Sequence, residues 1–336
     1  MMNPKHATRL LGSFLVVFGI HSLQAQDIPT TELNSARFIE LSKEVELSGG
    51  RVVGGRIFAV SDDKKDDVVF EVKRNGKTKK YIDLKRIQGF STYMSEGSRS
   101  KRLDLEGLEF CGSTMYLADE RSRQVLVVNH GRMSWITWED KDLKPWGKSL
   151  GEIGKNDGFE GIAVDCDHQI LYVAKERDPR FIIEFDLEKK TIKDVFDLPV
   201  SLRHGKKGLD PSGSGKEIQI NADFADLTFR DGYLYVLERN AAEISKVDPK
   251  TKKVVHRYIF PNYFRLFDVL SDAGVIEPFG LAEGLDVRGD TFWLFIDNNG
   301  GKLNAKGKAL GIHQHSKKTP TGKEALIMML KADPKI

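Results

Sequence analysis

Four carboxylates recur along the chain at nearly regular intervals, and they are the side chains best suited to chemistry. They are Glu106, Glu160, Asp226 and Glu283, separated by 54, 66 and 57 residues, and Ser48 holds the equivalent place 58 residues before Glu106. Carboxylates held close together raise one another's pKa, and a hard cation such as Ca²⁺, which prefers oxygen ligands, relieves their repulsion. We predict that these four acids bind calcium, with Glu160 and Glu283 as catalytic candidates. A purely structural role, fastening neighbouring repeats, is the alternative.

A second set of acids lies further along each repeat, at the end of the second apolar segment. Its members are Asp62, Asp119, Glu120, Glu176, Glu238 and Asp297, the last followed by Asn298 and Asn299. Three of these acids precede an arginine, in Glu120-Arg121, Glu176-Arg177 and Glu238-Arg239. Adjacent pairs of opposite charge suit ion pairs between repeats, so we favour a structural role for these three Glu-Arg pairs.

Basic side chains lie in two long connections between the apolar runs. Arg203, His204 and Lys206 occupy one connection, and His313 and His315 occupy another. Cationic loops above a carboxylate-bound cation would hold an anionic substrate such as a phosphate ester. A solvated basic surface explains the same residues without a ligand. Signatures of other enzyme classes, such as Gly-x-Ser-x-Gly, His-Glu-x-x-His and Cys-x-x-Cys, do not occur in the sequence.

The recurring acids belong to a repeated pattern of two apolar segments joined by a polar turn. Residues 158–165 and 170–177 show it most clearly, and related pairs follow Ser48, Glu106, Asp226 and Glu283. Two further segments rich in β-branched and aromatic residues follow most pairs, which favours strands. A long repeat of four short strands is typical of a propeller blade.

The last repeat lacks one strand, because only residues 325–330 follow its opening pair and its long insertion. A strand predicted at residues 37–41 can complete this repeat, which would close the ring and pair its open edges. We therefore predict an all-β fold, a single β-propeller of five four-stranded blades closed by the N-terminal strand. A sixth, degenerate blade within the long connections is the alternative.

The two cysteines, Cys111 and Cys166, follow the first strand of consecutive repeats at nearly the same position. Equivalent turns of adjacent blades are neighbours, so a disulfide between them is possible in an oxidising compartment. Two unpaired, partly buried thiols are the other interpretation.

The N-terminus has the pattern of a secretory signal. Lys5 and Arg9 precede an apolar run at residues 10–20, which is too short to span a bilayer, and Ala25 is a suitable cleavage position. We predict a signal peptide at residues 1–25, a polar leader at 26–36 and one domain at 37–336, in a periplasmic or secreted protein. Without residues 1–25 the chain carries 50 basic and 49 acidic side chains, so charge does not favour nucleic acid or membrane binding. We expect a monomer without a transmembrane segment.

The segment Glu160-Gly161-Ile162-Ala163-Val164-Asp165, with residues 171–179, resembles the recurring motif of the phytase-like propeller family, described as having esterase-like activity of phytase. It is equally similar to the SdiA-regulated propellers of bacterial envelopes. The resemblance covers residues 37–335 and implies an exported propeller that can bind calcium. Asp226-Leu227 replaces Glu-Gly, and Ser48 lacks a carboxylate, so this chain departs from a symmetric ring of acids.

These observations predict a calcium-dependent hydrolase of phosphate or carboxylic esters. The cation would polarise the ester oxygen and activate a water, a channel carboxylate would act as general base, and the loop cations would hold the anion. The alternative is a propeller without catalytic activity that binds an envelope protein, a glycan or a small ligand.

Overall fold

The computed structural model describes residues 28–42, 45–62, 67–152, 157–177, 179–199, 223–263, 265–270, 280–312 and 325–332, with the backbone of 208–209 and 217–218. The predicted signal peptide at residues 1–25 lies outside these ranges. In the part of the chain that is described, no helix is long and apolar enough to cross a membrane.

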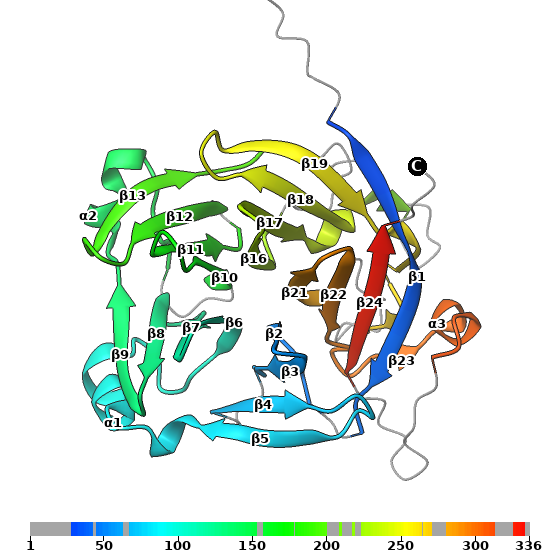
Figure 1. Ribbon diagram of the computed structural model, residues 1–336, viewed down its shortest axis with the longest axis horizontal. Helices are drawn as coiled ribbons and strands as arrows, with labels where there is room; N and C mark the ends of the chain where they lie inside the picture. Colours follow the sequence, from blue (N-terminus) through cyan, green and yellow to red (C-terminus); the bar gives the residue numbers. More distant parts are fainter. Residues whose placement is uncertain are drawn as a thin grey trace, which may run out of the picture.

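The fold is all-β and is built from antiparallel sheets of four strands in sequence order. The first sheet contains β2 (Gly50–Val53), β3 (Arg56–Ala59), β4 (Val68–Val72) and β5 (Thr78–Asp83). The second contains β6 (Leu105–Cys111), β7 (Thr114–Asp119), β8 (Gln124–Asn129) and β9 (Arg132–Thr137). The third contains β10 (Phe159–Asp165), β11 (Ile170–Lys175), β12 (Phe181–Asp186) and β13 (Thr191–Phe196). The remaining long strands form one larger sheet in the order β16 (Asp226–Arg230), β17 (Tyr233–Glu238), β18 (Glu243–Asp248), β19 (Lys253–Ile259), β1 (Thr30–Glu40), β24 (Leu326–Ala332), β22 (Thr291–Ile296) and β21 (Ala282–Arg288). Strands β2, β6, β10, β16 and β21 lie nearest the centre, as in a propeller (Figure 1).

The connections carry short elements only. They are η1 (Leu84–Arg86), α1 (Phe90–Thr92), η2 (Tyr93–Gly97), α2 (Asp140–Leu143), η3 (Lys144–Trp146), β14 (Gly208–Leu209), β15 (Glu217–Ile218), η4 (Arg239–Ala241), η5 (Pro261–Tyr263), β20 (Phe267–Asp268), β23 (Lys302–Leu303) and α3 (Ala305–Ala309). Strand β20 pairs with β23, so the insertion between β22 and β24 contacts the connection that precedes β21.

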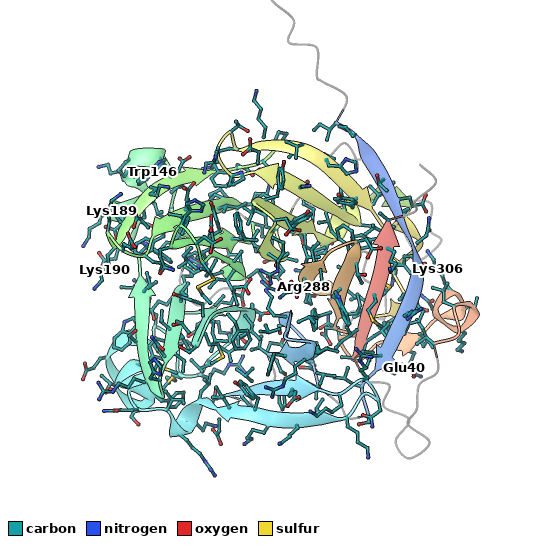
Figure 2. The ribbon with its side chains drawn as sticks, in the orientation of Figure 1. Glu40, Trp146, Lys189, Lys190, Arg288 and Lys306 are labelled. Carbon is teal, nitrogen blue, oxygen red and sulfur yellow. A yellow bond between two sulfur atoms is a disulfide. The ribbon has the colours of Figure 1, made fainter. Side chains whose placement is uncertain are left out.

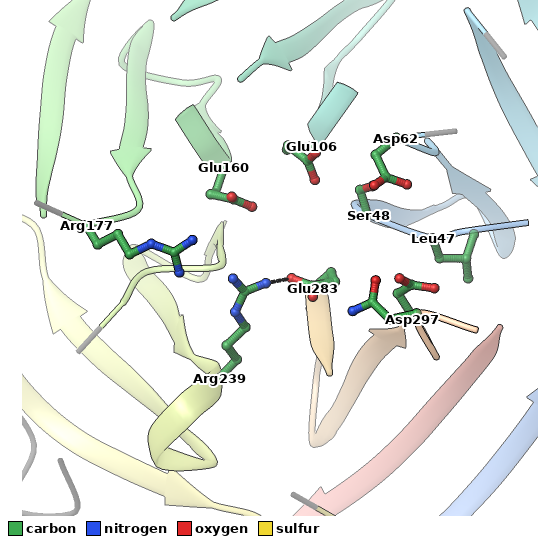
Figure 3. Close-up of a pocket in the computed structure, with 10 residues that line it drawn as sticks. Leu47, Ser48, Asp62, Glu106, Glu160, Arg177, Arg239, Glu283 and Asp297 are labelled. Atoms are coloured by element: carbon green, nitrogen blue, oxygen red, sulfur yellow. Dashed lines mark hydrogen bonds and ion pairs between the residues drawn. The ribbon is translucent and has the colours of Figure 1, made fainter. Parts of the chain in front are cut away.

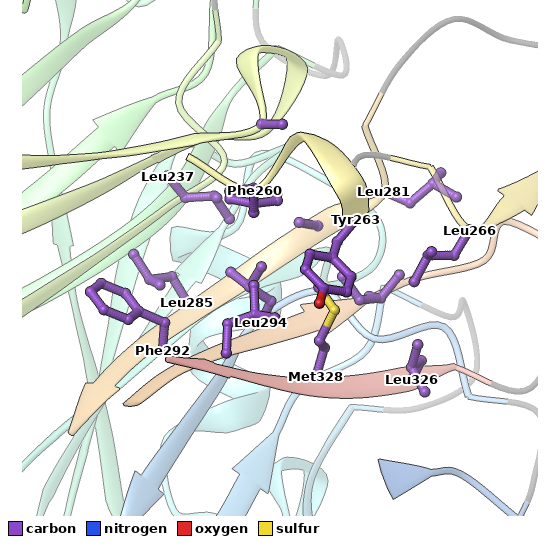
Figure 4. Close-up of a cluster of buried hydrophobic side chains, with 14 of the residues drawn as sticks. Leu237, Phe260, Tyr263, Leu266, Leu281, Leu285, Phe292, Leu294, Leu326 and Met328 are labelled. Atoms are coloured by element: carbon purple, nitrogen blue, oxygen red, sulfur yellow. The ribbon is translucent and has the colours of Figure 1, made fainter. Parts of the chain in front are cut away.

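Burial follows position in the sheet. Every residue of β10 is buried, whereas the outer strand β5 is partly or fully exposed along its length. Apolar side chains fill the space between neighbouring sheets: Leu237 of β17 packs with Leu285, Leu294 and Met328 from β21, β22 and β24 (Figure 4). Each sheet therefore depends on its neighbours to cover both faces, which explains why one repeat would not fold alone.

Strand β1 is longer than the sequence analysis predicts. It begins at Thr30, inside the segment expected to be a polar leader, rather than at Arg37. Leu33–Asn34 and Arg37–Glu40 pair antiparallel with β24, with a register shift between Asn34 and Arg37. The preceding residues Thr30–Glu32 pair parallel with β19. The polar residues at the start of β1 are thus ordered by backbone pairing to a second strand, which a search for apolar runs does not detect.

Arg51 of β2 lies on the axis and contacts all the innermost strands. Its side chain is fully buried, and its guanidinium donates to the carboxylates of Glu109 (3.1 Å) and Asp226 (2.7 Å). It also donates to four backbone carbonyls, those of Gly50 (2.7 Å), Ile162 (2.6 Å), Leu285 (2.7 Å) and Leu227. One side chain thereby joins β2, β6, β10, β16 and β21.

Cys111 and Cys166 are joined by a disulfide, with their Cα atoms 5.7 Å apart and a sequence separation of 55. Cys111 ends β6 and Cys166 directly follows β10, so the bridge links the innermost strands of two adjacent sheets.

Reducing this bridge is expected to lower the free energy of unfolding by about 2–4 kcal/mol, because the closed loop restricts the unfolded chain. Urea denaturation with and without dithiothreitol measures the effect. The Cys111→Ser/Cys166→Ser variant serves as control, since its midpoint should not respond to the reductant. An unchanged wild-type midpoint on complete reduction would contradict the prediction.

Candidate functional site

A polar cavity of about 300 Å³ opens on the propeller axis, at the ends where the innermost strands begin. Its lining residues are Leu47, Ser48, Asp62, Glu106, Glu160, Arg177, Arg239, Glu283, Asp297 and Asn299. Five of these ten side chains are carboxylates and two are arginines. Figure 3 shows the acids distributed around the cavity, with Arg177 and Arg239 on one side.

Three of the four predicted acids reach the cavity through the same local structure. The pairing of β6, β10 and β21 with their neighbours shifts register at Glu106-Gly107, Glu160-Gly161 and Glu283-Gly284. Such a β-bulge leaves one residue out of the ladder and redirects its side chain. The glycine that follows is required by close packing, because a Cβ on Gly107 would lie 2.5 Å from the carbonyl oxygen of Glu160.

Asp226 is not brought together with the other three acids. Strand β16 lacks the Glu-Gly pair, and its register with β17 runs unbroken from Asp226 to Arg230. The Asp226 carboxylate lies deeper on the axis, where it accepts from Arg51 (2.7 Å) and from the N–H groups of Leu285 and Leu227 (2.7 Å each). The structure therefore places Asp226 in the Arg51 network rather than on the cavity wall.

Members of the second acidic set join Glu106 and Glu160. The carboxylate oxygens of Asp104, Glu106 and Glu120 lie within 4.8 Å of one another, and so do those of Glu120, Glu160 and Glu176. Glu120 belongs to both groups, at the seam between the β6–β9 and β10–β13 sheets. The Glu-Arg pairs of the sequence predict ion pairing for Glu120 and Glu176, and the repeated pattern does not include Asp104.

Hydrogen bonding separates the ligand candidates from the structural acids of the second set. Asp119 accepts from the Tyr93 hydroxyl (2.5 Å), and Glu238 accepts from Ser245 (2.8 Å) and Arg180 (3.2 Å). By contrast, Oε2 of Glu120 and Oε2 of Glu176 are buried without a hydrogen-bond partner. An unpaired buried carboxylate oxygen is costly, so these two atoms mark positions where a cation would be stabilised.

The seam acids hold protons more tightly than ordinary carboxyl groups. Burial raises the pKa of Glu106 well above its usual value, and the charges of Glu120 and Asp62 add to the shift. Burial likewise raises the pKa of Glu160, with further contributions from Glu176 and Glu106. The pKa of Glu120 rises to about 8, mainly through burial. These groups would exchange protons for a cation near neutral pH.

Arg239 provides the main positive charge at the cavity. It follows β17 in η4 and pairs with Glu176 of the neighbouring sheet (2.5 Å), with Asp223 (2.8 Å) and with Glu283. Arg177 pairs with Glu176 at 2.6 Å. The Glu-Arg pairs are predicted to form ion pairs between repeats, and Arg239 does join adjacent sheets. It also lines the cavity, where its guanidinium could contact an anion.

The predicted substrate-binding residues, Arg203, His204, Lys206, His313 and His315, lie outside the described residues. Arg51 and Asp104 were not identified from the sequence. Arg51 has no counterpart in the other repeats, so a search for repeated residues does not identify it. The Glu-Gly signature identifies Glu106 but not its neighbour Asp104.

The fold and the site define a β-propeller with a carboxylate-rich cavity on its axis. The chain belongs to the phytase-like family, described as esterase-like activity of phytase, which matches residues 45–300. The glutaminyl cyclase of Myxococcus xanthus is similar in structure, with 10% identity, 91% of this chain and 100% of that chain covered, and a TM-score of 0.50. A gluconolactonase of Xanthomonas campestris has 10% identity over 85% of this chain and 72% of its own, with a TM-score of 0.42. At such identity these likenesses concern the fold alone. No curated protein matched the sequence.

Proposed function

We propose that the protein is an exported, five-bladed propeller, closed by β1, that hydrolyses phosphate or carboxylic esters at its axial cavity with a bound calcium ion. The pairing of β1 with β24 supports the closure, since it gives the last blade its fourth strand. The disulfide and the predicted signal at residues 1–25 support export to the periplasm or the medium.

One observation carries the proposed metal site: two buried carboxylate groups share Glu120 and contain oxygens without hydrogen-bond partners. All of these donors are hard oxygens, the ligand type that calcium prefers, whereas a thiolate or imidazole set would favour transition metals. Glu106, Glu120, Glu160 and Glu176 fit the cation. Asp226 does not share this position because Arg51 binds it.

Bound calcium would supply polarisation of the ester oxygen and a lowered pKa for a water. Glu160 is the better placed of the two catalytic candidates to accept a proton, because it is 4% exposed, lines the cavity and has a raised pKa. Glu283 is already bound by Arg239. Arg239 and Arg177 would orient an anionic substrate, since guanidinium groups match phosphate and carboxylate oxygens.

The experiment combines calcium titration by calorimetry with hydrolysis of p-nitrophenyl phosphate and p-nitrophenyl acetate. Glu160→Gln is expected to weaken calcium binding and to reduce turnover by about 10²–10⁴-fold, the usual contribution of a general base. The exposed Glu188→Gln is the matched control and should behave as wild type.

Two outcomes would change the proposal. Calcium binding without turnover of either ester would favour the alternative, a propeller that only binds an anionic small molecule, a glycan or an envelope protein. Calcium that neither binds nor stabilises the wild-type protein would refute the metal mechanism.

A further inference from the structure

A second cavity, a groove of about 1060 Å³, lies between the β6–β9 and β10–β13 sheets, and we call it the rim groove. Its lining residues come from strands of both sheets and from the connection that contains α2 and η3. Two of them, Trp146 and Lys190, lie along the same outer edge of the propeller (Figure 2). Of the described residues, none lines both the rim groove and the axial cavity, so the two sites are separate.

Three of the four tryptophans of the chain, Trp135, Trp138 and Trp146, line the rim groove. Trp146 belongs to η3, is partly exposed and packs against the apolar cluster between the two sheets. Its ring is therefore held in place by the core, while part of its surface remains accessible to a ligand.

Trp138 brings an unused hydrogen-bond donor to the groove. The side chain follows β9, is 3% exposed and makes edge-to-face contacts with Phe159 and Phe185, at centroid distances of 5.6 and 5.4 Å. Its Nε1 is buried and has no hydrogen-bond partner. A buried indole N–H usually has an acceptor, so the missing acceptor has to come from a water or a polar ligand in the groove.

Neutral polar side chains complete the lining. Nε2 of Gln169 donates to the carbonyl oxygen of Cys166 (2.7 Å), which orients the amide and leaves its Oε1 as an acceptor. Ser134 and Thr191 are exposed, and within the described part of the chain their hydroxyl groups take part in no hydrogen bond. The groove thus offers donors and acceptors that the protein itself does not use.

The charge of the rim groove is low. Its charged lining residues, among those the structure describes, are Lys141, Asp142 and Lys190. Lys141 pairs with the exposed Glu139 (2.8 Å), and the Asp142 carboxylate accepts from the N–H of Glu139 (2.8 Å) at the start of α2. Only Lys190 then remains to attract an anion, so the lining favours a ligand without charge.

We infer that the rim groove binds a neutral saccharide chain, with Trp146 as the stacking surface and Gln169, Ser134 and Thr191 as hydrogen-bond partners. A sugar ring has an apolar C–H face that packs on an aromatic ring, and its hydroxyl groups both donate and accept hydrogen bonds. An entirely apolar ligand would leave the polar groups of the groove unmatched. The volume lies at the upper end of the range of about 300–1,000 Å³ for ligand pockets, which suits a chain rather than a single ring.

A microarray of neutral oligosaccharides, probed with the purified wild-type protein, tests the inference, and an oligosaccharide bound there is then titrated in solution. Trp146→Ala should raise its dissociation constant about tenfold, because the stacking surface is lost. Gln169→Ala, at a turn outside the core, should raise it about two- to tenfold, the usual effect of one neutral hydrogen bond. Trp293→Phe, which alters the tryptophan outside the groove, is the matched control and should bind as wild type.

Quenching of tryptophan fluorescence by acrylamide places the bound oligosaccharide on the protein. The ligand should protect the fluorescence of wild type and of Trp293→Phe, because it covers Trp146. In Trp146→Ala this protection should be reduced, and circular dichroism shows whether the variant is folded.

The inference is overturned if the wild-type protein binds no oligosaccharide of the array, or if Trp146→Ala and Gln169→Ala both bind as wild type does. Binding that is lost in Glu160→Gln, or that p-nitrophenyl phosphate displaces, would place the saccharide in the axial cavity and also overturn it. Selection of Trp146-dependent peptides from a displayed library, with no glycan bound, would assign the groove to a peptide instead. Ester turnover and calcium binding have no part in these measurements, so the proposed function fails or stands separately.

Discussion

Replacing Arg51 by methionine is expected to lower the free energy of unfolding by about 3–5 kcal/mol, the typical cost of removing one partner from a buried ion pair. The substitution leaves Asp226, which is 0% exposed, without its counter-ion, and leaves the buried Glu109 with Arg230 alone, at 3.5 Å. It also removes donors to carbonyl oxygens on four innermost strands. Urea denaturation measures the loss.

Two further variants test this explanation. Arg51→Met/Asp226→Asn should be more stable than Arg51→Met, because asparagine carries no charge and can still accept from the N–H of Leu285. Arg51→Lys should fall between wild type and Arg51→Met, since an ammonium keeps the charge but cannot reach all the acceptors that the planar guanidinium contacts. A loss below about 1 kcal/mol for Arg51→Met would show that the axial network contributes little.

The metal-free protein is expected to lose stability as the pH rises from about 5.5 to 8.5. The pKa of Glu120 and that of Asp297 are both raised to about 8, from ordinary values of 4.5 and 3.8. The folded protein then binds more protons than the unfolded chain across this range, so the free energy of unfolding falls with increasing pH. Each unit of pKa elevation corresponds to about 1.4 kcal/mol, and the total should be on the order of a few kcal/mol.

Urea denaturation after EDTA treatment, at pH 5.5 and pH 8.5, measures this loss. Calcium at pH 8.5 should restore stability, because it binds the folded state and replaces the missing protons. The double variant Glu120→Gln/Asp297→Asn should flatten the pH dependence and the calcium response, and Glu188→Gln should alter neither. Stability that increases between these pH values in metal-free protein would contradict the assigned shifts.

Much of the architecture could be predicted because it depends on local patterns. Apolar segments of four to seven residues bounded by turns indicate strands, and their repetition indicated a propeller. The single strand at residues 325–330 pointed to an N-terminal partner, and β1 pairs with it. The Glu-Gly signature located three acids that line the cavity.

The chemistry of individual acids could not be predicted, because it depends on contacts between distant segments. Asp226 and Glu160 occupy similar places in their repeats, but their surroundings differ. A β-bulge in β10 includes Glu160, whereas the pairing of β16 at Asp226 is regular and Arg51 from β2 binds the Asp226 carboxylate. Likewise Asp119 and Glu120 are adjacent in sequence, yet only Asp119 meets a tyrosine hydroxyl from the preceding connection.

The sequence by itself determined which residues form strands and which acids recur, because backbone propensity and apolar periodicity act over a few neighbours. Only the tertiary structure decided which carboxylates are satisfied by arginines or hydroxyl groups and which retain an unpaired oxygen. For Asp119 and Asp226 that distinction arises from burial and from partners that are 26 and 175 residues away in the chain.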